Sequence, residues 1–193
     1  LMEAVVAVLP PGENETVRDP LRVAIVGHPN VGKSSYINRL LGNDENAAGI
    51  ETTLSGPTLK FNADTMICLV GAELEATLDG EPVPYWQAVS VRSGQVLKIG
   101  GVKGPGVRAY LAVRGGIDVP NYLGSRSTFT LGKFGGHAGR TLRTGDVLHI
   151  GASPERAPEA APLAATLKPR LTRNWEIGVL YGPHGAPDFF ASD

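Results

Sequence analysis

The sequence predicts a mainly β protein of the α+β class, in which short strands close into a barrel or sandwich behind an N-terminal strand–loop–helix unit. The first observation is a series of β-type runs between residues 51 and 150, separated by signals for tight turns. These signals are Ser55-Gly56-Pro57, Asp79-Gly80, Ser93-Gly94 and Thr144-Gly145. The second observation is an internal echo, because Gly94–Gly100 (GQVLKIG) recurs 51 residues later as Gly145–Gly151 (GDVLHIG). Each copy leads from a turn glycine into alternating apolar residues, which indicates two corresponding units of one barrel.

The N-terminal unit begins with residues 1–20, which we expect to be the end of a helix followed by a linker. Pro10-Pro11 would stop a helix that includes Leu1–Leu9, and residues 10–20 are rich in proline and acidic side chains. Residues 21–26 then form a short apolar strand. A helix over Lys33–Leu41 follows, with apolar residues on one side and Gly42 as its stop.

Between this strand and helix lies GHPNVGKS, which fits the phosphate-loop pattern at every fixed position. Its backbone amides and lysine would hold a phosphate, and Ser34 would bind Mg²⁺ if a nucleotide is bound. The phosphate-binding candidates are Gly27, Asn30, Gly32, Lys33 and Ser34. The stretch DPLRVAIVGHPNVGKSSYINRLLG resembles the linker and the start of the second G domain in the double-G-domain GTPase family Der/EngA. The chain contains no Asp-x-x-Gly and no Asn/Thr-Lys-x-Asp, so we do not expect GTP hydrolysis.

The candidate site is the glycine-rich stretch over residues 115–140, GGIDVPNYLGSRSTFTLGKFGGHAGR. β-type runs at Val107–Val113 and Val147–Ile150 flank it, so a sheet would carry these loops. Its seven glycines allow the backbone to approach a ligand, and its donors suit an anionic or ureido oxygen. A set of tight turns with solvated arginines is the structural alternative.

A second resemblance covers about three quarters of the chain, from Asn38 to the C-terminus. It rests on ENAAGIETTLSGPTLKFNADTMICLVGA, on YLAVRGGIDVPNYLGSRSTFTLGKFGGHAGRTLRTGDVLHIG and on WEIGVLYGPHGAPDFF. These strings resemble the biotin-dependent carboxyltransferase family, which includes the carboxyltransferase domain of urea amidolyase (urea carboxylase), allophanate hydrolase subunit 2 and the C-type subunit of 5-oxoprolinase. The resemblance implies a cyclophilin-like β-barrel and carboxyl transfer from carboxybiotin to urea or a similar amide. It also implies as partners a biotin carboxylase and a biotin carrier, or a subunit of the allophanate hydrolase subunit 1 type.

Carboxyl transfer needs a sheltered pocket, donors for a developing oxyanion and a base for the acceptor nitrogen. We expect His137 to be the base or a proton relay, and Arg126 or Arg140 to hold a carboxylate. Ser127 and Thr128 would donate to the oxyanion. Gly135, Gly136 and His184 are the candidates for contact with the biotin or the substrate. For each histidine, a structural hydrogen bond in a turn is the alternative.

The two resemblances meet near Asn38–Gly42, so the chain is expected to be a chimera whose carboxyltransferase part is truncated. The expected units are residues 1–20, the strand–loop–helix fragment at 21–42, the β-rich domain at 43–151, an Ala/Pro-rich connector at 152–170 and the start of a further segment at 171–193.

Composition narrows the function classes. The net charge of −1 gives no basic footprint for nucleic acid or membrane, and no apolar run approaches spanning length. The only cysteine, Cys68, lies in an apolar run, so we expect a buried structural thiol in a cytoplasmic protein with no leader peptide. Four histidines and one cysteine without ligand spacing predict no bound metal. Three functions stay open: a carboxyltransferase, a nucleotide-binding module, and a non-catalytic domain that docks on a partner subunit.

Overall fold

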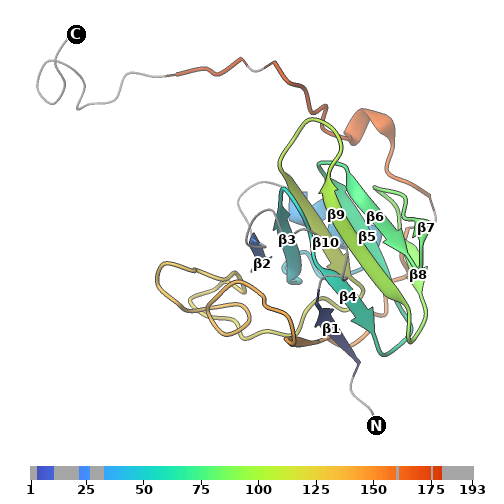
Figure 1. Cartoon of the computed structure of the whole chain (residues 1–193), viewed down its shortest axis with the longest axis vertical. Coiled ribbons are helices and arrows are strands. Elements are labelled where there is room, and N and C mark those ends of the chain that lie inside the picture. Colours follow the sequence, from blue (N-terminus) through green and yellow to red (C-terminus); the bar gives the residue numbers. More distant parts are fainter. Residues whose placement is uncertain (1–3, 11–21, 27–32, 160, 175, 180–193) are drawn as a thin grey trace, which may run out of the picture.

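The computed structural model describes residues 4–10, 22–26, 33–159, 161–174 and 176–179, and the side chains of 22–26 and 33–36 lie outside this description. Figure 1 shows two layers of strands and a long looped segment, coloured yellow to orange, that projects from one end.

Each layer is an antiparallel sheet. One has the strand order β11 (Val147–His149), β1 (Val5–Leu9), β4 (Thr58–Phe61), β9 (Val96–Val102), β6 (Leu74–Leu78), β7 (Glu81–Pro82). The other has the order β2 (Arg22–Val26), β3 (Gly49–Thr53), β10 (Arg108–Val113), β5 (Thr65–Gly71), β8 (Val89–Val91). The helix α1 spans Lys33–Leu40, and the short 3-10 helix η1 spans Ala165–Leu167.

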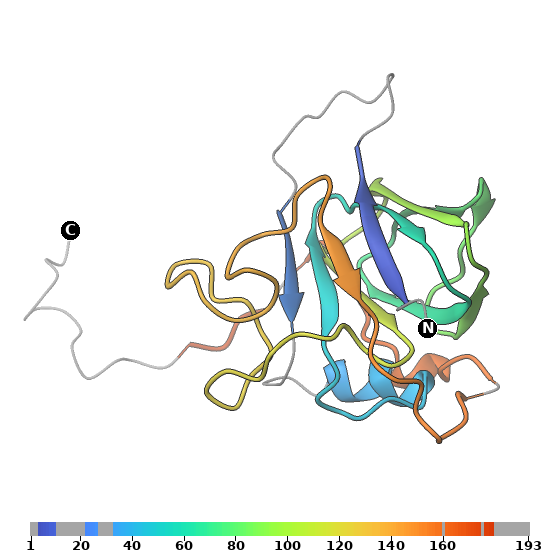
Figure 2. The same cartoon turned by 90° about the horizontal axis from the view of Figure 1, so that it is seen from below.

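Isolated bridges join the two sheets. Ile117 pairs with Ala48 beside β3 and with Ile150 beside β11, while Ser55 pairs with Gly101 of β9. These links curl the layers toward each other around a shared interior (Figure 2). The predicted mainly β, barrel-like fold class is confirmed.

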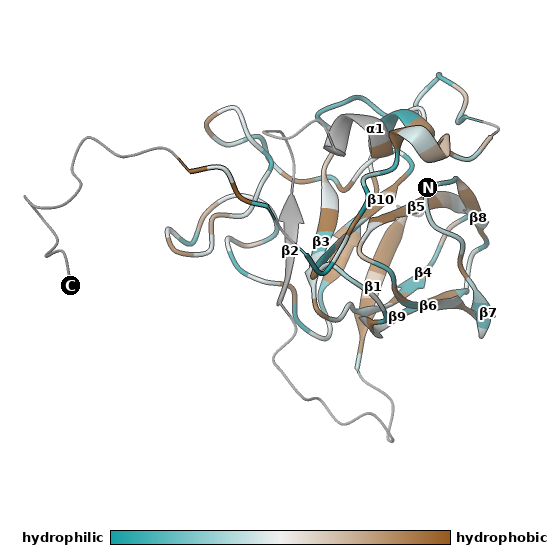
Figure 3. Ribbon diagram, turned by 90° about the horizontal axis from the view of Figure 1, so that it is seen from above, coloured by the Kyte–Doolittle hydropathy of each residue, from teal (hydrophilic) through white to brown (hydrophobic). Residues whose placement is uncertain are grey.

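The interior between the sheets holds the main hydrophobic core. Alternate residues of each strand point inward, as period-two geometry requires; in β5, for example, Ile67 and Leu69 are buried in this core. Figure 3 shows the apolar residues gathered along the strands and the polar ones in the loops. The largest fully buried side chains are Phe61, Leu41, Ile50, Leu59, Ile67, Leu69, Leu97, Leu111, Ile117, Leu148 and Val6.

A second, smaller core lies on the outer face of the five-stranded sheet, under α1. Ile37, Leu40 and Leu41 pack there against Cys68, Val70 and Ala112. The helix predicted at Lys33–Leu41 is therefore present, and its apolar side is buried against β5. Cys68 is fully buried there, as predicted, and burial raises the pKa of its thiol to about 12.

The first strand departs from the sequence-based expectation. Residues 5–9 form β1 rather than the end of a helix, and β1 lies between β4 and β11. Val6 and Val8 face the core and are 0% and 5% exposed. The two flanking strands offer a full ladder of backbone partners to this β-branched run, and this non-local pairing outweighs its local helical pattern.

The internal echo corresponds to two strands of one sheet, β9 and β11, which carry their buried leucines, Leu97 and Leu148, at equivalent positions. The turn glycines before them, Gly94 and Gly145, both have φ of 90°. After β11 the chain is held against α1, because Glu159 N donates to Leu40 O at 3.0 Å. Beyond this contact the connector is largely exposed.

Candidate functional site

The glycine-rich stretch between β10 and β11 projects from one end of the barrel as a folded pair of loops, coloured yellow to orange in Figures 1 and 2. It is fixed at its start. Ile117 is buried and bridged to both sheets, and Gly115 N donates to Asn43 Oδ1 at 2.8 Å. The loops therefore leave a rigid edge of the barrel.

Two buried asparagines tie the end of α1 to this edge. Asn43 Nδ2 donates to Val113 O at 2.9 Å and to Asn38 Oδ1 at 3.2 Å. Asn38 Nδ2 donates in turn to Ala47 O at 2.9 Å. The Asn43 amide thus accepts a hydrogen bond through its oxygen and donates through its nitrogen. It therefore connects the segment after α1 to Val113 and Gly115 at the end of β10.

A polar cleft of about 230 Å³ opens where these segments meet. Arg126 lines it together with the turn that follows α1, from which Asp44 and Asn46 contribute exposed charged or amide-bearing side chains. Asn46 N donates to Asp44 Oδ1 at 2.8 Å, which fixes the turn. The guanidinium of Arg126 makes no hydrogen bond or ion pair with any residue that the structure describes. The lining residues are Asn43, Asp44, Asn46, Ala47, Gly115, Arg126, Ala152 and Pro154.

Next to Arg126, the loop folds back on itself through a close backbone contact. Gly135 has φ of +73°, and a Cβ at this position would lie 2.2 Å from Ser127 O. Gly136, with φ of +51°, continues the same turn. The Thr128 hydroxyl is buried and has no hydrogen-bond partner in the described part of the chain. The structure thus brings together Ser127, Thr128 and Gly135, three of the residues selected from the sequence.

His137 and Arg140 belong to a different contact, centred on Asp146 at the start of β11. Arg140 forms two hydrogen bonds of 2.8 Å to the two oxygens of Asp146, and Arg143 N donates to the same carboxylate at 2.8 Å. His137 Nε2 lies 3.7 Å from Asp146 Oδ1. The hydrogen bonds from Arg140, above all, lower the pKa of Asp146 to about 2, and the same bonds raise the pKa of Arg140.

The guanidinium of Arg140 is therefore engaged in holding the loop, whereas that of Arg126 is available to a ligand. His137 lies beside this pair without a hydrogen bond to Asp146, since the two atoms are 3.7 Å apart. The remaining candidates, Gly27, Asn30, Gly32 and His184, lie outside the described residues, as do the side chains of Lys33 and Ser34.

The tip of the loop carries an exposed aromatic cluster. Phe134 stacks at a tilt on Tyr122 and on Phe129, with ring centroids 5.0 and 5.2 Å apart. Leu123 and Leu131 beside it are 85% and 87% exposed. The cluster stiffens a loop that has few other apolar contacts.

Sequence reasoning missed the turn at residues 43–47 and the role of Asp146. The run Asn43-Asp44-Glu45-Asn46, directly after the helix stop at Gly42, was a usable signal, because short polar side chains there favour turns that bond the backbone. Among the described residues no group of three His, Cys, Asp or Glu side chains is placed to hold a metal ion. No helix in the described part of the chain is long and apolar enough to cross a membrane.

Comparisons with known proteins agree with this architecture. The urea amidolyase of Saccharomyces cerevisiae is 44% identical over 93% of the chain, which covers 10% of that protein. The C-type subunit of the Escherichia coli 5-oxoprolinase is 44% identical over 64% of the chain and 39% of that protein. The crystal structure of Kluyveromyces lactis urea carboxylase superposes with a TM-score of 0.80 at 34% identity, over 95% of the chain and 18% of that structure.

A shorter match concerns a different class of protein. The GTPase Der of Gemmatimonas aurantiaca is 61% identical over 44 residues, which is 23% of the chain and 10% of that GTPase. The resemblance to Der noted from the phosphate loop is thus supported over a short segment.

The chain spans about a tenth of the length of the urea amidolyases that it matches. The family described as "Carboxyltransferase domain, subdomain A and B" matches residues 30–193. The sequence-based recognition of a carboxyltransferase is therefore confirmed, and the chain belongs to this carboxyltransferase domain family.

Proposed function

We propose that this chain supplies a carboxylate-binding and ureido-binding surface of a biotin-dependent carboxyltransferase, centred on the cleft at Arg126. The observation that carries the proposal is the guanidinium of Arg126, unpaired among the described residues, in a polar cleft between two rigid segments. A guanidinium offers a planar fork of donors, which suits a carboxylate or a ureido oxygen.

The donors and acceptors of the cleft fit a ureido group, which has one carbonyl oxygen and two N–H groups. Arg126 can donate to the oxygen, and the carboxylate of Asp44, which lines the same cleft, can accept from an N–H. Urea, a cyclic amide and the biotin ring share this chemistry. When bound, carboxybiotin would supply the carboxyl group that is transferred.

The residues of the loop would act on charge and protons. Arg126 would hold the negative oxygen in place. Thr128 and Gly135 lie beside it in the chain fold but are not among the described lining residues of the cleft, so they would support the loop rather than donate to the oxyanion. His137 would accept the proton of the acceptor nitrogen, which requires the acceptor to extend from the cleft toward His137. Arg140 holds the loop through Asp146 rather than binding the carboxylate.

The proposal requires partners, because carboxybiotin forms elsewhere. A biotin carboxylase and a biotin carrier would supply it in a urea amidolyase-like assembly. In a 5-oxoprolinase-like assembly, a companion protein of the allophanate hydrolase subunit 1 type would complete the site.

The test uses the whole chain with free carboxybiotin and with 2-imidazolidinone, a cyclic ureido compound that reports binding apart from catalysis. We expect Arg126→Ala to lower the decarboxylation rate about tenfold to a hundredfold and to abolish the imidazolidinone-induced NMR shifts at residues 43–47. Arg143→Ala, which removes an exposed arginine of the same loop, should change neither. Equal shifts in both variants would refute the site. Shifts without any rate above buffer would leave a binding domain that docks on a catalytic partner.

The short match to Der favours a second candidate function, nucleotide binding with Mg²⁺ at residues 27–34. Calorimetric titration with GTP and with ATP would detect it, because Lys33→Ala should remove the heat of binding. Equal heats for the parent chain and this variant would exclude nucleotide binding there.

A further inference from the structure

A second, larger groove lies on the outer face of the five-stranded sheet, beyond the part that α1 covers. Its volume is about 580 Å³, within the range of small-molecule pockets. Val70 of β5 and Tyr110 of β10 line it, and Trp86 and Leu171 contribute further apolar walls. It opens at the Arg108 end of β10, whereas the Arg126 cleft lies past the other end, about 20 Å away at the rise of an extended strand.

The groove lies where the apolar outer face of the five-stranded sheet is not covered by α1. Under α1 the same sheet face is sealed, with Cys68, Val70 and Ala112 buried. Trp86 and Tyr110 pack on the edge of this small core, and their other sides line the groove. The groove therefore offers two aromatic surfaces that the fold holds in position.

Trp86 has an unfavourable backbone conformation, with φ of +64°. Bulky side chains rarely adopt this region. Contacts on both sides hold it there: Trp86 N donates to Leu69 O at 2.8 Å, and Leu163 N donates to Trp86 O at 2.9 Å. The neighbouring Tyr85 hydroxyl is bonded to the backbone of Leu74. Such imposed strain is concentrated at ligand-binding positions in proteins.

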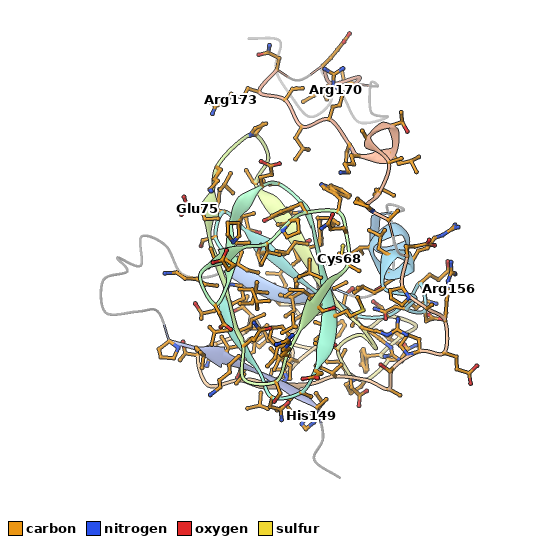
Figure 4. The ribbon with its side chains drawn as sticks, turned by 90° about the vertical axis from the view of Figure 1, so that its right-hand side faces the viewer. Cys68, Glu75, His149, Arg156, Arg170 and Arg173 are labelled. Carbon is orange, nitrogen blue, oxygen red and sulfur yellow. The ribbon has the colours of Figure 1, made fainter. Side chains whose placement is uncertain are left out.

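The charged side chains among the described lining residues of the groove are arginines. Arg108 and Arg173 line it, and no acidic side chain stands among its described lining residues. Arg108 Nε lies 3.7 Å from Glu51 Oε1, and Arg173 is exposed and has no hydrogen bond or ion pair with a described residue. Arg173 lies on the segment that passes above the barrel in Figure 4, three residues from Arg170, which does not line the groove.

We propose that this groove binds a small organic anion with a flat apolar body, which lies against Trp86 and Tyr110 while its carboxylate meets Arg173 and Arg108. Aromatic walls favour a flat ring. Arg173, which has no partner among the described residues, favours a negative end, and Arg108, which is shared with Glu51, adds to it. The site is independent of the proposed carboxyl transfer at Arg126.

The chain contains two tryptophans, Trp86 and Trp175, so an ¹⁵N-labelled sample gives two indole N–H signals, which Trp86→Phe assigns. The probe is 2-naphthoate, and 2-naphthamide is its uncharged counterpart. We expect 2-naphthoate to shift the Trp86 signal and 2-naphthamide to bind about fivefold more weakly. Arg173→Ala should weaken naphthoate binding about threefold to tenfold, while Arg170→Ala should leave it unchanged.

Equal effects of the two arginine variants would overturn the proposal, as would equal affinity for the acid and the amide. A naphthoate-induced shift confined to the loop at residues 122–134 would also overturn it, because binding would then occur at the exposed aromatic cluster. Arg173 is exposed, so its replacement leaves the barrel folded, and thermal unfolding of each variant checks this.

Discussion

The carboxylate of Asp146 is the electrostatic centre of the loop that carries the candidate site, and its replacement by asparagine tests that role. The pKa of Asp146 falls from 3.8 to about 2 on folding, chiefly because Arg140 donates two hydrogen bonds. At about 1.4 kcal/mol per pKa unit, this shift corresponds to roughly 2.4 kcal/mol. The side chain of Arg140 is 32% exposed, so solvent screening lowers the expected loss in Asp146→Asn to about 1–2 kcal/mol.

The sign follows from the direction of the shift. The folded-state pKa lies below the unfolded-state value, so the stabilisation is present above about pH 4 and is lost as the pH falls toward 2. Urea unfolding can be followed by tryptophan fluorescence. The free energy of unfolding of the parent chain should exceed that of Asp146→Asn at pH 6, and this difference should fall to about half by pH 3. His137→Gln, which keeps the Arg140 pair, is the control. A difference of the same size at both pH values would refute an electrostatic role for Asp146.

Three further predictions follow from burial and backbone geometry. Asn43→Ala should lower the free energy of unfolding by about 2–4 kcal/mol in a urea titration, because it leaves the buried groups at Val113 and Gly115 without their partner. Asn46→Ala, at an exposed position, is the control and should change this free energy by less than about 0.5 kcal/mol. Gly135→Ala should speed amide hydrogen exchange across the loop and not in the barrel strands, because its Cβ would meet Ser127 O at 2.2 Å; unchanged exchange in the loop would contradict this. Cys68, with its pKa raised to about 12, should resist a thiol reagent in the native chain and react at once in urea; rapid reaction without urea would show that α1 does not cover it.

Sequence patterns predicted the turns, most of the strands and the helix α1 because these depend on local signals. Gly94 and Gly145 set turns wherever the strands lie, and the apolar side of α1 marks a helix that must pack on something. The conversion of Val5–Leu9 into a central strand was not predictable, since it depends on β4 and β11, which lie some 50 and 140 residues further along the chain.

The candidate site shows the same limit. The sequence identified Arg126 and Arg140 as equivalent donors in one loop. Only the fold separates them, because Asp146 comes within reach of Arg140 and the turn after α1 comes within reach of Arg126. Asp44 and Arg126 are brought to one cleft by a barrel edge that no local spacing encodes.

The packing of residues 22–41 explains how one segment can resemble two unrelated families. The barrel uses the backbone of β2, which pairs with β3 at the edge of its sheet, and an edge strand places few demands on sequence. From the helix it uses the apolar side chains of Ile37, Leu40 and Leu41, which seal Cys68 and Val70.

The specific requirement on this segment begins at Asn38, whose amide joins Asn43 and the turn that forms the Arg126 cleft. The barrel otherwise needs only an edge strand and a helix with an apolar side. A strand–loop–helix unit from a phosphate-loop protein provides both. The specific requirement is met by the helix end Asn38-Arg39-Leu40-Leu41-Gly42, where the two resemblances overlap. The described part of the cleft is therefore supported by the part of the chain that both patterns share and by the carboxyltransferase barrel.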